Sequence, residues 1–133
     1  MTDPLIIWIE KPLAVAIHER QLAEHGGVTG VRDEKLLESA LARPQQLFAH
    51  GDPPPDIADL AASLACGVAR NHPFVDGNKR TALTCLEYFL YLNGFRLDAS
   101  PAQRETYTLK VASAHPDLTD VAHWVAAHLV KAY

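Results

Sequence analysis

Apolar residues recur every three or four positions through most of the chain, which is the spacing of one face of an α-helix. The clearest pattern follows Asp56, a candidate N-cap, and places apolar side chains on one face: Ile57, Leu60, Ala61, Leu64, Ala65 and Val68. Residues 78–93 form a second helical stretch closed by Gly94, and beyond Arg80 its only charged residue is Glu87. Because this stretch is apolar nearly all round, we expect it to be the central, buried helix of the fold.

Four further patterns predict helices, over residues 13–24, 34–44, 101–114 and 118–129. Pro12 suits the first position of the first of these, and Asp33 can cap the second, which should end at Pro44 or a little beyond it. A capping box at Ser100–Gln103 opens the third, and His115-Pro116 should stop it. The last helix should place these apolar residues on one face: Leu118, Val121, Ala122, Val125 and Leu129. The predicted fold is therefore all-α, a compact bundle of about six helices in a single domain over residues 1–133.

Two segments fall outside the helical pattern. The apolar run Leu5–Ile9 is too short for periodicity to separate strand from helix. We expect it to pack on the core, in preference to forming an exposed strand edge that pairs with a partner. The run Pro53-Pro54-Pro55 supplies no backbone donors to regular structure, so it should be a rigid, exposed connector that can border a binding site.

The composition narrows the class of protein. Of the 133 residues, 48% are hydrophobic and 21% charged, which is the balance of a globular domain. The net charge of −4 argues against broad binding to a nucleic-acid backbone. No apolar run approaches the roughly 20 residues that cross a bilayer, and the N-terminus has no basic leader. We expect a soluble, cytoplasmic protein whose two cysteines, Cys66 and Cys85, are reduced and buried.

The candidate chemistry is concentrated in residues 70–82, Arg-Asn-His-Pro-Phe-Val-Asp-Gly-Asn-Lys-Arg-Thr-Ala, between the two clearest helical patterns. Pro73 keeps the residues before it out of helical geometry, and Gly77 lets the backbone approach a ligand. Since this loop leads into a helix N-terminus, the free N–H groups and the helix dipole there favour an anion. Lys79 and Arg80 add full positive charges. The segment therefore predicts a phosphate cradle.

Three polar side chains add to the cradle. Asn78 can donate hydrogen bonds to a phosphate oxygen, and Asp76 is an oxygen ligand suited to Mg²⁺. His72 carries an imidazole that can accept a proton near neutral pH, which makes it the candidate general base. Phosphate transfer depends mainly on positioning and charge stabilisation, so this set is sufficient. No Ser or Cys in the loop is placed as a covalent nucleophile and no P-loop pattern is present, so the nucleophile should come from the substrate.

Two other residues have open interpretations. His18 lies on a mainly apolar helix face, where we favour a structural role over a functional one. Arg70 can be a solvated residue at a helix end or a second phosphate contact, and the sequence favours neither.

At these residues the chain resembles the Fic/Doc family, whose signature reads HxFx(D/E)GNGRxxR. The match runs from His72 to Arg80, and His18, Arg32-Asp33 and residues 37–44 look like the death-on-curing branch, so the resemblance covers most of the chain. The resemblance implies roles for individual residues: His72 as general base, Asp76 as Mg²⁺ ligand, Gly77 and Asn78 in the anion hole, and Arg80 as a phosphate contact.

The chain departs from the Fic signature at two positions. Lys79 stands where Fic proteins have their second glycine, and Leu83 stands where they have the final arginine. A lysine would occupy or recharge the anion hole, and loss of the arginine removes a contact expected to orient the nucleotide for AMP transfer. The death-on-curing branch is similar to this chain at both positions, although its best-known pattern has Ala where this chain has Gly77. For that branch the resemblance implies a protein kinase in which ATP is reversed and its γ-phosphate reaches the reaction centre.

The resemblance therefore implies a toxin of a toxin–antitoxin system that phosphorylates a threonine or serine of a translation factor, elongation factor Tu, and inhibits translation. The predicted catalytic residues are His72, Lys79 and Arg80, the predicted cofactors are ATP and Mg²⁺, and the phosphate-binding and metal-binding residues are Gly77, Asn78, Lys79, Arg80 and Asp76. The resemblance implies a Phd-like antitoxin as protein partner. The alternatives are a Fic-like adenylyltransferase and a catalytically weak module that mainly binds the antitoxin.

Overall fold

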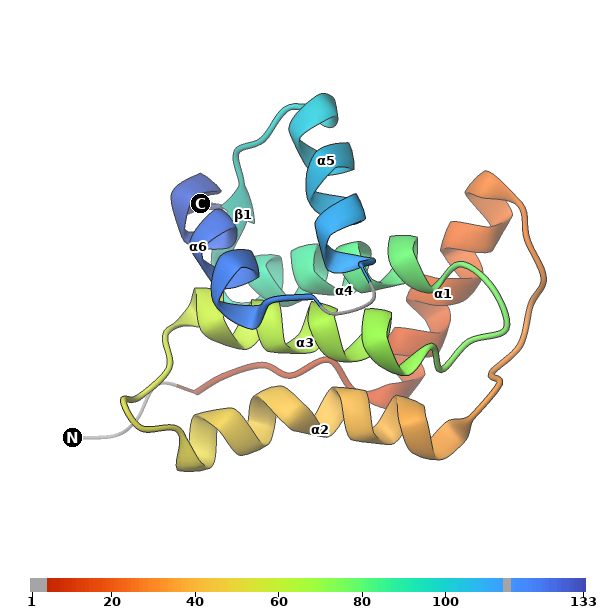
Figure 1. The fold of residues 1–133 in the computed structure, drawn as a ribbon, viewed down its shortest axis with the longest axis horizontal. Helices are drawn as coiled ribbons and strands as arrows, with labels where there is room; N and C mark the ends of the chain where they lie inside the picture. Colours follow the sequence, from red (N-terminus) through yellow and green to blue (C-terminus); the bar gives the residue numbers. More distant parts are fainter. Residues whose placement is uncertain (1–4, 114–115) are drawn as a thin grey trace.

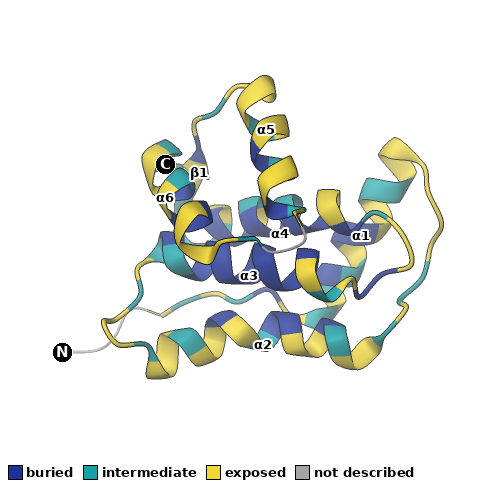
Figure 2. Ribbon diagram, viewed as in Figure 1, coloured by how far each residue is buried: buried dark blue, intermediate teal, exposed yellow. Residues whose placement is uncertain are grey.

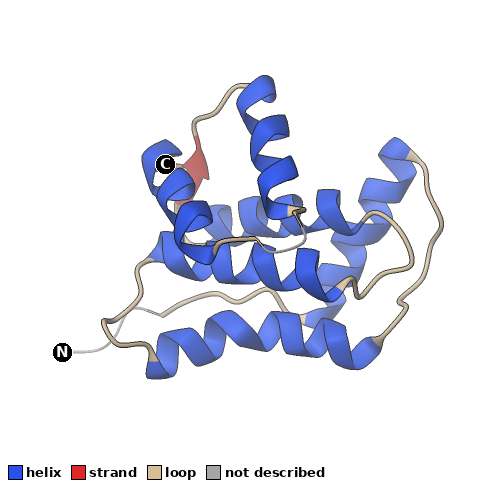
Figure 3. Cartoon of the chain, in the orientation of Figure 1, coloured by secondary structure: helices blue, strands red, loops and turns tan. Residues whose placement is uncertain are grey.

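A computed structural model describes residues 5–113 and 116–133. It shows a fold built almost entirely from helices. The described elements are α1 (Lys11–His25), α2 (Glu34–His50), α3 (Ile57–Asn71), α4 (Asn78–Leu92), β1 (Phe95–Leu97), α5 (Pro101–Val111), α6 (Leu118–His128) and β2 (Leu129–Lys131) (Figure 1). Helix dominates every layer of the molecule (Figure 3). The predicted all-α class with about six helices is confirmed.

The central helix is α3, and the prediction that residues 78–93 form it was wrong. Nearly every residue of α3 after Ile57 is buried, whereas α4 leaves Tyr88 and Tyr91 exposed (Figure 2). The reason is the size of the α3 side chains: many are Ala, Ser or Gly, so α2, α4 and α6 can all approach it closely. At Gly67 a Cβ atom would lie 3.3 Å from the backbone of Ala40 in α2, which shows how closely these helices pack.

Helix α2 continues past the predicted end at Pro44 and reaches His50. A proline inside a helix removes one backbone hydrogen bond and normally interrupts it. Here Pro44 is buried on the same face as Leu37 and Leu41, which pack in the hydrophobic core. This tertiary packing offsets the lost hydrogen bond, and the sequence pattern alone does not reveal it.

A two-stranded antiparallel sheet joins the segment that follows α4 to the segment that follows α6. Strand β1 pairs with β2 in a register that places Leu97 opposite Leu129. The sequence prediction placed Leu129 on the face of the last helix. It was wrong by one residue, because α6 ends at His128 and Leu129 begins β2. Strands of three residues are too short to produce a recognisable alternation of polar and apolar positions.

The N-terminal apolar run packs on the core in part and forms no strand in the described residues 5–10: Ile6, Trp8 and Ile9 lie at the core, whereas Leu5 and Ile7 are exposed. Ile9 is buried, and the ring of Trp8 contacts Phe48 of α2 and Phe89 of α4 at centroid distances of 5.7 and 5.9 Å. The backbone of Ile7 is held from both sides by the Asn93 amide, which accepts from its N–H and donates to its carbonyl, each at 2.9 Å. The segment is thus attached to the core through alternate side chains.

Helix caps formed at the predicted positions. Asp56 and Asp59 make a reciprocal capping box at the start of α3, and Ser100 and Gln103 make another at the start of α5. Helix α5 ends at Val111, and the expected stop at His115 lies outside the described residues. Within the described ranges, no helix combines the length and apolarity needed to span a bilayer.

Candidate active site

The loop between α3 and α4 carries the predicted chemistry and is held by the loop between α1 and α2. The two loops lie at the same end of the molecule in Figure 1. The backbone N–H of Arg32 donates to the Pro73 carbonyl at 2.7 Å, and that of Val75 donates to the Gly30 carbonyl at 3.0 Å. The turn between α1 and α2 therefore fixes the course of the loop between α3 and α4.

His72 terminates α3 in the left-handed conformation, with φ 48° and ψ 55°, and its side chain is exposed. A non-glycine residue in this region costs roughly 1–2 kcal/mol, so surrounding contacts must hold it. Arg32 supplies them: its Nε donates to the His72 carbonyl at 2.8 Å and its Nη2 to the Asn71 carbonyl at 3.0 Å. A guanidinium also complements the negative end of the α3 dipole. His72 is thus turned out of the helix at a fixed point.

Asn78 is buried and serves the loop, not an external anion. Its Nδ2 donates to the Phe74 carbonyl at 2.9 Å, and its Oδ1 accepts from the Phe74 N–H at 3.0 Å. The expectation that this side chain donates to a phosphate oxygen is therefore corrected, because the amide is turned inward. The backbone N–H of Asn78 remains as its contribution to an anion, since it lies in the first turn of α4.

His18 lies beneath the catalytic loop, where sequence reasoning favoured only a general structural role. The ring is almost fully buried and stacks on Phe74 with a centroid distance of 3.9 Å and an interplanar angle of 6°. Its Nε2 lies 2.7 Å from the Asp76 carbonyl oxygen, so we assign the proton to Nε2 as the donor. His18 therefore supports the metal-ligand candidate from below, across 58 residues of sequence.

The carboxylate of Asp76 is exposed and is oriented by two backbone groups. Oδ1 accepts from the Gly77 N–H at 2.8 Å, and Oδ2 accepts from the Val28 N–H at 3.2 Å. Gly27 approaches so closely that a Cβ atom there would lie 2.9 Å from Oδ2. Each oxygen keeps a further lone pair, which fits Mg²⁺, a cation that binds through one or two carboxylates, water and phosphates. In the described part of the chain no three His, Cys, Asp or Glu side chains gather as a metal cage.

The first turn of α4 completes the arrangement. Gly77 caps it in the left-handed conformation at φ 73°, and Lys79 and Arg80 are exposed beside the free backbone N–H groups. A depression of about 380 Å³ brings together all six residues predicted for the site, with Val75 as a further lining residue: His72, Asp76, Gly77, Asn78, Lys79 and Arg80. The loop therefore presents an imidazole, a carboxylate and a cationic helix N-terminus to one space.

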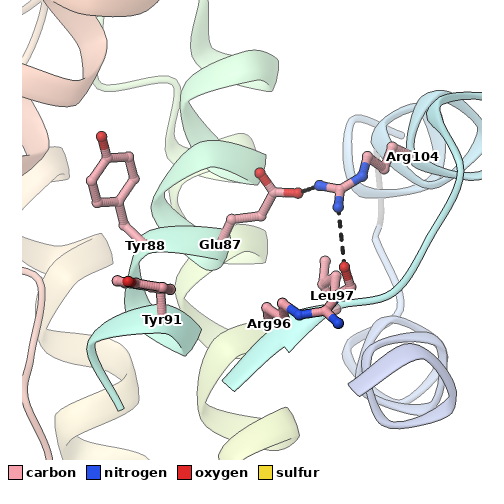
Figure 4. Close-up of a pocket in the computed structure, with 6 residues that line it drawn as sticks. All are labelled: Glu87, Tyr88, Tyr91, Arg96, Leu97 and Arg104. Carbon is pink, nitrogen blue, oxygen red and sulfur yellow. Dashed lines mark hydrogen bonds and ion pairs between the residues drawn. The ribbon is translucent and has the colours of Figure 1, made fainter. Parts of the chain in front are cut away.

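A second depression, of about 480 Å³, lies beside the C-terminal half of α4 (Figure 4). It holds none of the predicted catalytic residues. An ion pair between Glu87 of α4 and Arg104 of α5 crosses one side of it, and Arg104 also donates to the Leu97 carbonyl at 3.1 Å. Tyr88 and Tyr91 lie on the opposite side from Arg104. These contacts anchor the start of α5 to α4 and β1.

The two thiols offer no rival nucleophile. Burial raises the pKa of Cys66 to about 11 and that of Cys85 to about 12, so both remain protonated near neutral pH.

Comparison with known proteins places the chain among relatives of one kind. The family model described as Fic/DOC family matches residues 8–90. The chain is 40% identical to Toxin Doc of Mycolicibacterium smegmatis over 109 residues, which cover 80% of this chain and 84% of that protein. It is 31% identical to Protein kinase doc of Escherichia phage P1 over 108 residues, which cover 81% of this chain and 84% of that protein.

Proposed function

The chain belongs to the Fic/Doc family, and on that basis we propose that it is a toxin that transfers the γ-phosphate of ATP to a hydroxyl group of another protein. One observation carries this proposal: an exposed histidine, an exposed carboxylate and a cationic helix N-terminus line a single depression. The names of the two relatives, one a toxin and one a protein kinase, agree with it.

The proposed reaction assigns each group one task. His72 accepts the proton of the target hydroxyl while the hydroxyl oxygen forms a bond to the γ-phosphorus. The bond from the γ-phosphorus to the β-phosphate oxygen breaks, and ADP leaves with the electron pair. Lys79, Arg80 and the backbone N–H groups of the first turn of α4 stabilise the negative charge on the transferring group.

Asp76 is the residue that would hold Mg²⁺, which neutralises charge on the ATP phosphates when bound. The chain prepares this ligand by fixing its direction. The N–H groups of Val28 and Gly77 hold the carboxylate, and His18 holds the carbonyl of the same residue. The side chain therefore does not have to be ordered when the substrate arrives.

Two residues favour γ-phosphate transfer over AMP transfer. Lys79 lies in the catalytic depression where the Fic signature has glycine, and Leu83 follows one turn later where that signature has arginine. The nucleotide contact that the Fic arginine is expected to make is therefore replaced by an apolar side chain. Gly77 agrees with the Fic signature, and for this reason AMP transfer is the second candidate.

The target and the partner follow from the family resemblance. Elongation factor Tu is the proposed target, modified on a threonine or serine, with arrest of translation in the cytoplasm as the consequence. A Phd-like antitoxin is the proposed partner that silences the enzyme.

A labelling experiment separates the candidate functions. Purified protein is incubated with elongation factor Tu and ATP that carries the label on either the γ- or the α-phosphate. The kinase proposal expects label on the target from γ-labelled ATP only, and none with His72→Ala. Label from α-labelled ATP overturns it in favour of AMP transfer. No transfer from either, with His72→Ala still toxic to cells, supports the antitoxin-binding module.

A further inference from the structure

The extended segment at residues 5–10 has one paired edge and one unpaired edge. It runs as an extended trace toward the start of α1 (Figure 1). The Asn93 side chain binds both the N–H and the carbonyl of Ile7 at 2.9 Å, as a neighbouring strand would. In an antiparallel ladder every second residue bonds to a given neighbour, so the backbone groups of Ile6 and Trp8 belong to the opposite edge.

That opposite edge has no partner. Among residues 5–113 and 116–133, neither Ile6 nor Trp8 donates or accepts a hydrogen bond through its backbone. Buried backbone groups are almost always paired, so these groups face water. Proteins usually protect such an edge with charged side chains or proline, yet residues 5–9, Leu-Ile-Ile-Trp-Ile, contain neither.

Exposed apolar surface accompanies the unpaired edge. Leu5 is 91% exposed and Ile7 is 47% exposed, and they alternate with Ile6 and Trp8, which pack against the core. A groove of about 430 Å³ lies along the segment, and its lining is apolar apart from Glu10: Ile6, Ile7, Trp8, Pro12, Leu13 and Leu92. A second strand placed here satisfies the backbone groups and covers apolar surface in one step.

We propose that this edge pairs with the same edge of a second copy of the chain, in an antiparallel arrangement with a two-fold axis at Ile7. In this register Ile6 exchanges both backbone hydrogen bonds with Trp8 of the second copy, and Ile7 faces Ile7 of the second copy. A two-fold dimer uses the same surface on both chains. The proposal concerns assembly and does not depend on the proposed function.

The limits of the segment favour a second copy over an unrelated strand. Pro4 has no N–H and cannot extend a ladder at one end, and α1 begins at Lys11 at the other. The two-fold register matches position 4 of each strand with position 10 of the other, so both strands stop at the same points. A longer strand would leave its own groups unpaired. Positions 5–9 carry no charge, so no like charges meet.

The pairing leaves the catalytic depression open. Asn93 follows the C-terminal end of α4, whereas the catalytic loop precedes its other end, and a helix of 15 residues is about 22 Å long. The contact involves one short strand from each copy, so it is smaller than the interfaces of permanent dimers. We therefore expect a dimer that dissociates on dilution.

Sedimentation velocity of the whole protein from about 1 µM to about 1 mM tests the association. The wild type should shift from monomer to dimer within this range. Ile7→Lys places like charges face to face and should weaken association at least about tenfold. Leu109→Lys is the matched control and should associate like the wild type. It changes a 65% exposed leucine of α5, which lies on the other side of α3 from this segment in Figure 1. Circular dichroism verifies that each variant is folded.

Cysteine cross-linking tests the register. The Cα atoms of a pair without mutual hydrogen bonds are about 4.5 Å apart, a distance that a disulfide spans. Ile7→Cys should therefore form a covalent dimer on oxidation by copper phenanthroline. The two Leu5 positions are about 14 Å apart in this register, so Leu5→Cys should cross-link far less, although Leu5 is the more exposed residue. The wild type, whose two cysteines are buried, gives the background.

Amide exchange of the wild type, followed by NMR, needs no variant. The N–H groups of Ile6 and Trp8 should exchange at least about fivefold more slowly in the dimer than in the monomer. The N–H of Ile7 should keep its rate, because Asn93 holds it in each copy.

Three results overturn the proposal: a wild type that is monomeric at about 1 mM, a dimer that Ile7→Lys leaves intact, or cross-linking of Leu5→Cys equal to that of Ile7→Cys. If the wild type stays monomeric and Ile7→Lys weakens binding of the Phd-like antitoxin, the edge binds the antitoxin and self-pairing is wrong. The proposed function fails separately, because a dimer that transfers no phosphate refutes the kinase and leaves the pairing standing.

Discussion

Replacing His18 by phenylalanine separates support of the catalytic loop from simple filling of the core. Phenylalanine keeps an aromatic ring of similar volume against Phe74, but it cannot donate to the Asp76 carbonyl. The native hydrogen bond is 2.7 Å long and the histidine is 1% exposed, so the carbonyl loses its buried partner. Leaving this part-buried carbonyl without its partner costs about 1–3 kcal/mol. In a domain of this size, that lowers the melting temperature by about 3–10 °C.

The effect on catalysis should exceed the effect on stability. The lost bond frees the backbone of Asp76, so its carboxylate is no longer held in one direction. A displacement of about 1 Å of a positioned group can reduce turnover about 100-fold. We therefore expect kcat for γ-phosphate transfer to fall by 10-fold to 100-fold in His18→Phe at temperatures where the variant is fully folded, with a smaller change in the KM for the protein target.

Two companion variants make the experiment decisive. His18→Gln keeps a side-chain N–H donor and should recover part of the lost kcat. His123→Phe changes an exposed histidine of α6 and should alter neither melting temperature nor kcat. If His18→Phe is as stable and as active as the wild type, or if His18→Gln is no better than His18→Phe, the supporting role assigned to the His18 hydrogen bond is wrong.

Three more changes test other parts of the account. Gly27→Ala should reduce activity at least 10-fold and lower stability, because a Cβ atom there would lie 2.9 Å from the Asp76 carboxylate and the backbone φ is +128°. A crystal structure of the variant shows whether that carboxylate has moved, and an unmoved carboxylate contradicts the reasoning. Asn78→Ala removes both hydrogen bonds to Phe74 and should lower the free energy of unfolding by about 2–3 kcal/mol in urea titrations. A loss under about 0.5 kcal/mol, which is typical of a surface substitution, argues against the role of these two hydrogen bonds. The free energy of unfolding should also fall as pH rises from about 9 to about 11. Burial raises the pKa of Cys66 to about 11 and that of Cys85 to about 12, so the unfolded chain loses its thiol protons at a lower pH than the folded chain. Denaturant titrations at several pH values should show a smaller fall in Cys85→Ala, and an identical fall excludes a contribution from that thiol.

The helices could be predicted because their signals are local. Asp56 and Ser100 are caps that act within three residues, and the apolar face from Ile57 to Val68 repeats every three or four residues. The continuation of α2 past Pro44 and the three-residue strands depend on packing between distant segments. The identity of the central helix also depends on packing. The small side chains of α3 make it central because α2, α4 and α6 all pack against it.

The candidate site shows the same division. Residues 72–80 are contiguous, so the sequence could indicate that their side chains gather at one helix N-terminus. The groups that hold them come from far along the chain: His18 under the loop, Arg32 at the end of α3, and Val28 on the carboxylate. A single sequence carries no signal of these pairings. The inward orientation of the Asn78 side chain could not be predicted either. Its partner Phe74 lies in the same motif as the expected phosphate site, so the motif alone does not show which of the two the amide contacts.

The most direct test of the central claim is to identify both products of one reaction. Elongation factor Tu is incubated with the purified protein, Mg²⁺ and ATP, and the target and the released nucleotide are analysed by mass spectrometry. The account predicts that the target gains the mass of one phosphoryl group on a threonine or serine, that ADP is released in equal amount, and that His72→Ala gives neither product. Addition of AMP to the target with release of pyrophosphate, or phosphorylation that persists in His72→Ala, would contradict it.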